Sequence, residues 1–183
     1  KIMMGENIDR VWVFAHLGVC DIEEIFSKIR FMIIGCECKW IVVDHLHMLV
    51  AASMEIDERK AIDNIMHRLR SMVEETGAGM ILVSHLRRVE GNKAHETGVS
   101  VNLSHLRGSQ SIAQLSDCVI ALERNQQAVD IEEANTTVVR VLKSRYTGDV
   151  GIAGNLLYNR DTGRLKEVFD FDEFDSIPQG DLL

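Results

Sequence analysis

The sequence is poor in proline and in aromatic residues, and it has no long hydrophobic run. One proline in 183 residues excludes a proline-rich or collagen-like chain. No apolar segment reaches the ~20 residues that a bilayer-spanning helix needs, and no signal peptide opens the chain. With 46% hydrophobic and 26% charged residues, the composition favours one globular domain, cytoplasmic and without a membrane partner.

Cysteine is also scarce, with four residues at positions 20, 36, 38 and 118. A chain of this length can build a hydrophobic core without disulfides, so reduced thiols in a cytosolic protein are the favoured interpretation. Cys36 and Cys38 have no second cysteine pair to complete a set of ligands, which argues against a structural zinc site.

Charge is distributed unevenly along the chain. The net charge of −8 argues against a protein that simply coats nucleic acid. Residues 167–183 contain six acidic residues and no lysine or arginine, whereas residues 1–166 carry a net charge of only −2. We therefore predict a near-neutral core over residues 1–166, in which a local basic loop could still meet DNA, and an acidic tail over residues 167–183.

Apolar runs and segments with 3.6-residue periodicity alternate along the core. We predict strands over residues 11–14, 40–44, 80–85, 118–123, 136–142 and 152–158, and helices between Asp21 and Gly35, over 57–76 and over 109–115. This order predicts an α/β fold, in which a mostly parallel sheet has helices on both faces and the last two strands form an antiparallel extension. The polar segment 87–104 shows no period and is long enough to be functional or disordered.

Polar residues stand where the predicted strands end, and ligands bind at the carboxyl ends of parallel strands. These residues are Asp44, Ser84, His85, Glu123 and Arg124. Asp44 follows four apolar residues, as in a Walker B strand, whose carboxylate holds Mg²⁺, usually through water. His85 could reach a γ-phosphate from the next strand. The alternatives are an aspartate that caps the next loop and a histidine satisfied by loop carbonyls.

His45 and His47 flank the end of the Asp44 strand, so zinc ligation is conceivable. No third ligand stands at a sensible spacing, which argues against metal binding by these histidines.

The segment after His85 gathers basic residues, which are Arg87, Arg88, Lys93, His95 and, just beyond it, Arg107. Such a loop could grip a phosphate backbone, and an ordinary solvated loop is the alternative. Farther along, Lys143 and Arg145 are two residues apart and share a face of a strand. They could act as an arginine finger on a neighbouring subunit's nucleotide, but the spacing alone favours an ordinary surface pair.

No G-x-x-x-x-G-K-[ST] loop occurs in these 183 residues. The other motifs nevertheless fall in a specific order: the apolar strand ending at Asp44, Val-Ser-His at 83–85, Lys-Ala-His-Glu at 93–96, Leu-Arg-Gly-Ser at 106–109, Gln-Leu-Ser-Asp at 114–117, Ala-Leu-Glu-Arg-Asn-Gln-Gln at 121–127 and Leu-Lys-Ser-Arg-Tyr-Thr-Gly-Asp at 142–149. In these motifs the chain resembles the DnaB-type, RecA-like hexameric replicative helicases, including phage helicase–primases and mitochondrial Twinkle, over residues 11–165.

The resemblance implies an incomplete RecA-like P-loop NTPase core that uses ATP or dTTP with Mg²⁺. Asp44 would be the Walker B carboxylate that holds Mg²⁺ through water, His85 would sense the γ-phosphate, and Arg145 would be the arginine finger, with Lys143 beside it. Arg124 and Tyr158 would sandwich the base, a role that suits a guanidinium and a phenol ring.

The resemblance also implies a hexameric ring around single-stranded DNA, in a phage-infected bacterial cell. Channel contacts would come from Arg87, Arg88, Lys93, His95, Arg107 and Gly108, and Gln114 would pass on the nucleotide state. The acidic tail, with Phe169, Phe171 and Phe174, would dock a replicative polymerase, or would be a solubilising disordered end.

The sequence departs from the family in several places. His105 stands where aspartate is usual, Ala113 replaces a basic residue, and the loop 124–135 is long and acidic. In relatives the P-loop and the carboxylate base precede the segment that begins here, so we expect a piece of a longer protein, inactive alone. A recombinase-like motor and a non-catalytic, polymerase-docking module remain the alternatives.

The P-loop strand of relatives lies in mid-sheet, between the strand that ends at His85 and the strand that ends at Glu123. Without it, we predict either direct pairing of these two strands or self-association of the chain through their open edges.

Overall fold

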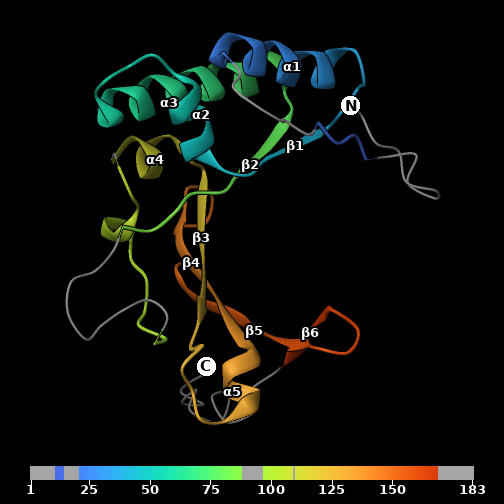
Figure 1. The fold of residues 1–183 in the computed structure, drawn as a ribbon, viewed down its shortest axis with the longest axis vertical. Helices are drawn as coiled ribbons and strands as arrows, with labels where there is room; N and C mark the ends of the chain where they lie inside the picture. Colours follow the sequence, from blue (N-terminus) through green and yellow to red (C-terminus); the bar gives the residue numbers. More distant parts are fainter. Residues whose placement is uncertain (1–10, 15–20, 88–96, 109, 169–183) are drawn as a thin grey trace, which may run out of the picture. The chain divides into compact units, whose positions relative to one another are not determined.

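The computed structural model describes residues 11–14, 21–87, 97–108 and 110–168 (Figure 1). In chain order the elements are α1 (Ile22–Ile34), β1 (Trp40–Val43), α2 (Leu46–Ala52), α3 (Glu58–Thr76), β2 (Gly79–Leu82), the 3₁₀ turn η1 (Leu103–His105), α4 (Gln110–Leu115), β3 (Cys118–Arg124), α5 (Ile131–Asn135), β4 (Thr136–Ser144), β5 (Gly151–Asn159) and β6 (Arg164–Val168). The chain divides into two compact units: the α/β unit, Lys1–Arg87 with Leu106–Ser116, and the β unit, Arg88–His105 with Asp117–Leu183.

The α/β unit contains the two longest helices and a parallel strand pair. Its helices begin and end as their sequence signals predict: the Asp21 and Asp57 side chains accept hydrogen bonds from the first-turn N–H groups of α1 and α3. α3 ends at Gly77, whose φ of 68° is the left-handed conformation that glycine adopts without strain. β1 and β2 pair in parallel, from Trp40 beside Gly79 to Val43 beside Leu82.

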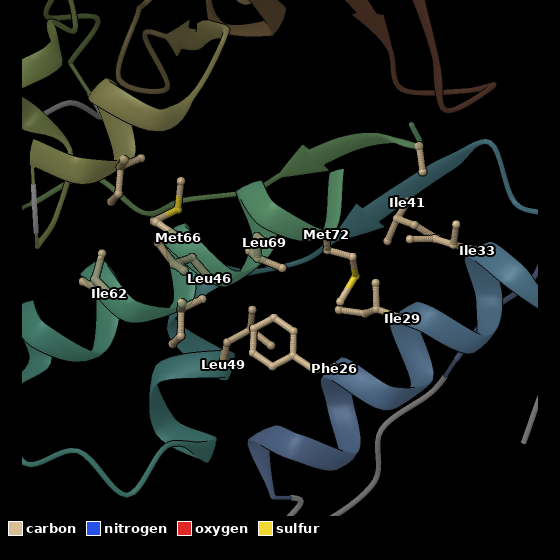
Figure 2. Close-up of a cluster of buried hydrophobic side chains, with 13 residues drawn as sticks. Phe26, Ile29, Ile33, Ile41, Leu46, Leu49, Ile62, Met66, Leu69 and Met72 are labelled. Atoms are coloured by element: carbon tan, nitrogen blue, oxygen red, sulfur yellow. The ribbon is translucent and has the colours of Figure 1, made fainter. Parts of the chain in front are cut away.

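The core of the α/β unit lies between α1, α2, α3 and one side of this strand pair (Figure 2). Its fully or nearly buried members are Phe26, Ile29, Ile33, Ile41, Leu46, Leu49, Ile62, Ile65, Met66, Leu69, Met72, Ala78 and Ile112. Figure 2 shows side chains of α1 and α3, among them Ile29 and Met72, pointing toward one another. On the other side of the strand pair Trp40, Val42 and Ile81 are exposed, so the described helices cover one face of it.

The β unit is an antiparallel meander with the strand order β3-β4-β5-β6. The antiparallel extension expected over 136–142 and 152–158 is confirmed in β4 and β5. Three of its features were not anticipated: β3 pairs antiparallel with β4, a short α5 interrupts the acidic loop, and β6 follows the turn after β5.

Two local expectations fail in the described residues. The segment 11–14 is not a strand, because it contributes only a single bridge residue at Phe14. The strand expected at 80–85 does not pair with the strand that begins at Cys118: the described strands form two separate sheets, β1-β2 and β3-β4-β5-β6. Direct pairing is therefore wrong, and self-association stays a prediction. Within the described residues, no helix is both long and apolar enough to cross a bilayer.

Candidate functional site

The carboxyl ends of β1 and β2 are joined by backbone hydrogen bonds that continue past both strands. The Val83 amide donates to the Val43 carbonyl at 3.0 Å, and the Leu46 amide donates to the Val83 carbonyl at 2.8 Å. Asp44 and His85 therefore emerge at one edge of the strand pair, as the sequence pattern predicted. Asp44 is exposed, and its carboxylate forms no hydrogen bond or ion pair within the described part of the chain.

The backbone of His85 is tied directly to the segment that carries Arg107 and Gly108. The Arg107 amide donates to the His85 carbonyl at 3.1 Å, and Leu86 and Leu106 form an antiparallel bridge beside it. Gly108 has a φ of 109°, and a Cβ built there would collide with the Ile62 side chain. Glycine is therefore required at this position both by its backbone conformation and by the close approach of α3.

The Arg107 side chain turns toward the start of α3. Its Nε donates to Oε1 of Glu58 at 3.1 Å and its Nη2 donates to Oε2 at 3.4 Å. This two-point contact holds Arg107 at the surface, with about half of its side chain exposed. Gln114, expected to relay the nucleotide state, lies on the exposed side of α4, and Arg87 is exposed where the α/β unit ends. Arg88, Lys93 and His95 lie outside the described residues.

Three histidines meet beside Asp44. The ring of His85 lies 4.0 Å from that of His45 and 5.4 Å from that of His47, measured between ring centroids. The spacing of His45 and His47 offered no third ligand, but the structure supplies one from the end of β2. One ring nitrogen from each histidine lies within 4.8 Å of the others.

The His47 side chain is 11% exposed, and Oε1 of Glu58 lies 3.7 Å from its Nε2 atom. Burial, helped by nearby Arg107 and His85, lowers the pKa of His47. The ring is therefore neutral at neutral pH, with a lone pair on one nitrogen.

In the β unit, Arg145 is held just after the end of β4. Its amide donates to the Asp117 carbonyl at 2.8 Å, and its Nη1 atom lies 3.1 Å from Oδ1 of the same residue. Lys143 lies two residues earlier, paired with Val119 of β3. The Arg145 side chain is 44% exposed, so it is oriented by Asp117 and still accessible from solvent.

Arg124 and Tyr158 lie on the same face of the antiparallel sheet. Arg124 is opposite Thr137 of β4, Thr137 is opposite Leu156 of β5, and Tyr158 is two residues beyond Leu156. Their expected role, to sandwich a nucleotide base, stays a prediction. The Arg124 guanidinium is also oriented by the α5 segment, since its Nε donates to the Ala134 carbonyl at 2.6 Å.

A buried ion pair in the β unit has a role that the sequence did not reveal. Oε1 of Glu123 accepts hydrogen bonds from Nε of Arg140 at 2.8 Å and from the amide of Val101 at 2.7 Å. Thr97 forms an isolated antiparallel bridge with Asn125. These contacts anchor residues 97–101, where the chain returns from the basic segment. A glutamate at the end of an apolar strand was the available signal, but it did not indicate the partners.

The fold is that of the RecA-like DnaB and KaiC-type proteins. The chain is similar to a DnaB-like replicative helicase, studied with regard to its interactions with primase, with a TM-score of 0.65 at 23% identity over 83% of this chain and 36% of that one. It is also similar to a KaiC-like protein from Pyrococcus horikoshii OT3, with a TM-score of 0.54 at 15% identity over 80% of this chain and 56% of that one. The predicted fold class is confirmed.

The family follows from sequence. The model of the DnaB-like helicase C-terminal domain matches residues 7–167, and the chain belongs to that family. It is 42% identical over 158 residues to a DNA helicase/primase of Enterobacteria phage T3, which covers 86% of this chain. The chain spans 27% of the length of that relative. The family resemblance drawn from the motifs is thus confirmed.

Proposed function

We propose that this chain is the C-terminal part of the motor domain of an ATP-dependent replicative DNA helicase. It would bind ATP or dTTP with Mg²⁺ at the interfaces of a hexameric ring and couple hydrolysis to translocation along single-stranded DNA. Membership of the family and the 42% identity to a phage helicase/primase support this proposal. The cytoplasm of a phage-infected bacterium would be its place of action. Because the 183 residues hold no P-loop, we expect no hydrolysis by this chain alone.

The observation that carries the proposal is the backbone connection between His85 and Arg107. A motor must convert the presence or absence of a γ-phosphate into movement of a DNA-binding segment. Here the carbonyl of the proposed sensor, His85, accepts a hydrogen bond from the amide of Arg107, a proposed DNA contact. A shift of His85 would therefore move Arg107 and Gly108 without any intermediate element.

Asp44 suits the magnesium ion that the family implies. Mg²⁺ keeps several waters and is held by one or two carboxylates together with substrate phosphates. An exposed carboxylate at a strand end, with no protein partner among the described residues, can accept hydrogen bonds from such waters. The ion itself would offset the negative charge of the phosphates and of the transferred phosphoryl group.

Arg145 is proposed to act on a neighbouring subunit's nucleotide. An arginine finger stabilises charge in the transition state, and its loss lowers turnover by about 10³–10⁵-fold. In the complete protein, Arg145→Ala should lose NTP hydrolysis by a factor in this range while nucleotide binding stays within about twofold. The matched control is Arg164→Ala, which removes an exposed arginine from β6 and should keep normal turnover. Retained hydrolysis in Arg145→Ala, with the ring intact by native mass spectrometry, would exclude the finger role.

The basic segment is proposed to hold single-stranded DNA. Lys93→Ala in the complete protein should weaken DNA binding and reduce the slope of log affinity against log salt by about 0.7, one phosphate contact on a single strand. The control is Lys60→Ala, at an exposed position of α3, which should leave the slope unchanged. A Lys93→Ala slope equal to that of the control would count against the channel assignment.

A non-catalytic module that docks a polymerase is the second candidate, favoured by the lack of a P-loop in these residues. In that case the part of the acidic tail beyond β6, residues 169–183, would carry the function. Removing the tail should then abolish polymerase binding, whereas Arg145→Ala would change nothing.

A further inference from the structure

The three histidines beside Asp44 form a cluster of nitrogen ligands that no step of the proposed motor requires. Of the three histidines, only His85 is proposed to contact the nucleotide. His45 precedes α2, and His47 lies in its first turn. The hydrogen bonds from Val83 to Val43 and from Leu46 to Val83 hold the α2 start against the end of β2. The cluster is therefore a consequence of the fold and not of one flexible side chain.

Three of the six ring nitrogens of this cluster are buried without a hydrogen-bond partner among the described residues. Nδ1 of His45 and both ring nitrogens of His47 are buried and form no hydrogen bond within the described structure. A buried polar atom without a partner costs about 1–3 kcal/mol, so native proteins usually supply water, protein or an ion. Glu58, 3.7 Å from Nε2 of His47, adds a carboxylate at the edge of the cluster. Metal-bound histidines commonly have such a carboxylate beside them.

We propose that His45, His47 and His85 form a binding site for one transition-metal ion of the Zn²⁺ type, separate from the Mg²⁺ site at Asp44. Imidazole suits Zn²⁺, Cu²⁺ and Ni²⁺, whereas Mg²⁺ prefers oxygen. Three histidines plus a water or carboxylate complete a tetrahedral zinc shell.

The described geometry needs only side-chain adjustment to bind the ion. Zn–N distances of about 2.0–2.1 Å place tetrahedral ligand nitrogens about 3.4 Å apart. The three nitrogens lie within 4.8 Å of one another before any ion is present, so small rotations of the rings close the site.

One consequence rests on the proposed function. A metal ion bound to one ring nitrogen of His85 would fix the orientation of the ring and leave only the other nitrogen for a γ-phosphate. An occupied site would therefore hold the sensor in one state and inhibit hydrolysis in the complete protein. His47→Asn should relieve that inhibition, since it weakens the metal site and leaves His85 in place.

The binding test uses the whole chain without nucleotide, Mg²⁺ or DNA, so that its failure would leave the helicase proposal untouched. Zn²⁺ is titrated against a competing chelator, and Co²⁺ is used as a spectroscopic probe of tetrahedral nitrogen ligation. We expect one ion per chain that excess Mg²⁺ does not displace. His47→Asn should weaken binding at least tenfold, whereas His67→Asn, on the exposed side of α3, should bind as the parent does.

Two further variants guard the interpretation. Cys36→Ser combined with Cys38→Ser removes the thiol pair that precedes β1 and should leave binding unchanged; burial raises the pKa of Cys38, which disfavours its thiolate. His85→Asn changes an exposed ring, so it should fold normally by circular dichroism and still lose the site. Binding that survives both histidine variants, or that is lost with the cysteines, overturns the proposal.

Discussion

The two units of this chain are stabilised in different ways. In the α/β unit, side chains from α1, α2, α3 and β1 bury one another in a continuous apolar cluster. In the β unit, Val101 and Ala121 are the buried hydrophobic residues among those described, and every residue of β4 is only partly buried. Glu123 and Asn135 are buried there instead, each within a set of hydrogen bonds.

The two units therefore differ in how strongly their stability depends on exact geometry. Apolar burial stabilises in proportion to area and has no direction, whereas a network of hydrogen bonds depends on the geometry of each partner. The proposed nucleotide contacts Arg124, Lys143, Arg145 and Tyr158 belong to the β unit, and Asp44 and His85 belong to the α/β unit.

Both tryptophans, Trp12 and Trp40, lie in the α/β unit and both tyrosines in the β unit, so each unit has its own optical probe.

The largest effect is expected in the apolar core. Leu69 is 3% exposed and belongs to the cluster of Figure 2. Leu69→Ala should lower the free energy of unfolding by about 3–4 kcal/mol, through lost burial and the cavity that remains. The control, Leu122→Ala on exposed β3, should cost less than about 0.5 kcal/mol. Urea unfolding followed by far-UV circular dichroism, which reports both units, measures both costs, and equal costs would contradict the stated location of the core.

The next effect tests the polar network of the β unit. Glu123→Gln would leave Arg140 without its charged partner, and we expect a loss of about 2–3 kcal/mol, toward the lower end for a buried pair because Arg140 is partly exposed. Hydrogen exchange at the Val101 amide should accelerate, since its acceptor oxygen is altered. Glu132→Gln, at an exposed position of α5, should change neither quantity by much. Slow exchange at Val101 in Glu123→Gln would show that the network is dispensable.

Sequence signals predicted the elements that have strong local determinants. α1 and α3 combine 3.6-residue periodicity with aspartate caps, and their predicted ends agree with the structure within a residue or two. α2 was not predicted because it has seven residues and no side-chain cap from His45. α5 has five residues within an acidic loop. Short helices of this kind are stabilised by tertiary packing, which local patterns do not contain.

Partner choice was the part that local pattern could not supply. The apolar run at 118–123 predicted a strand, but pairing with β4 depends on a segment that follows it by an α-helix and a loop. The convergence of Asp44 and His85 was predicted because both end strands. The meeting of His47 with His85 was not predicted. Ligand-spacing rules apply to residues near one another in the chain, whereas β1-β2 pairing brings in His85 from 38 residues away.

A backbone effect comes third. Gly108→Ala should cost about 2 kcal/mol, because alanine is strained at a φ of 109° and its Cβ would meet Ile62. Gly148→Ala is the matched control: Gly148 also has a positive φ, 77°, but nothing lies within 4 Å of the added Cβ. The control should cost about 1 kcal/mol from strain alone. If urea unfolding gives the two variants the same cost, the close approach to α3 contributes nothing.

The smallest effect is expected for an ion pair on the surface of the α/β unit, where charge contributes little to stability. Hydrogen bonds from both terminal nitrogens of Arg68, at 2.6 and 2.7 Å, lower the pKa of Glu23. A carboxyl whose pKa is lower in the folded state stabilises the fold above its unfolded pKa, about 4.3, and this contribution is lost as the pH falls through the folded value. Glu23→Gln should therefore lower the urea midpoint slightly at pH 7 and not at all at strongly acid pH.

The control is Glu55→Gln, which changes a nearby exposed carboxylate without an ion pair among the described residues. It should show a smaller difference between the two conditions. Salt should also reduce the Glu23→Gln effect, because exposed pairs are screened, whereas the Leu69→Ala loss should persist. A Glu23→Gln loss that survives both acid and salt would mean that packing of Arg68 over the Phe26 ring, 3.9 Å from its centroid, depends on the carboxylate as well.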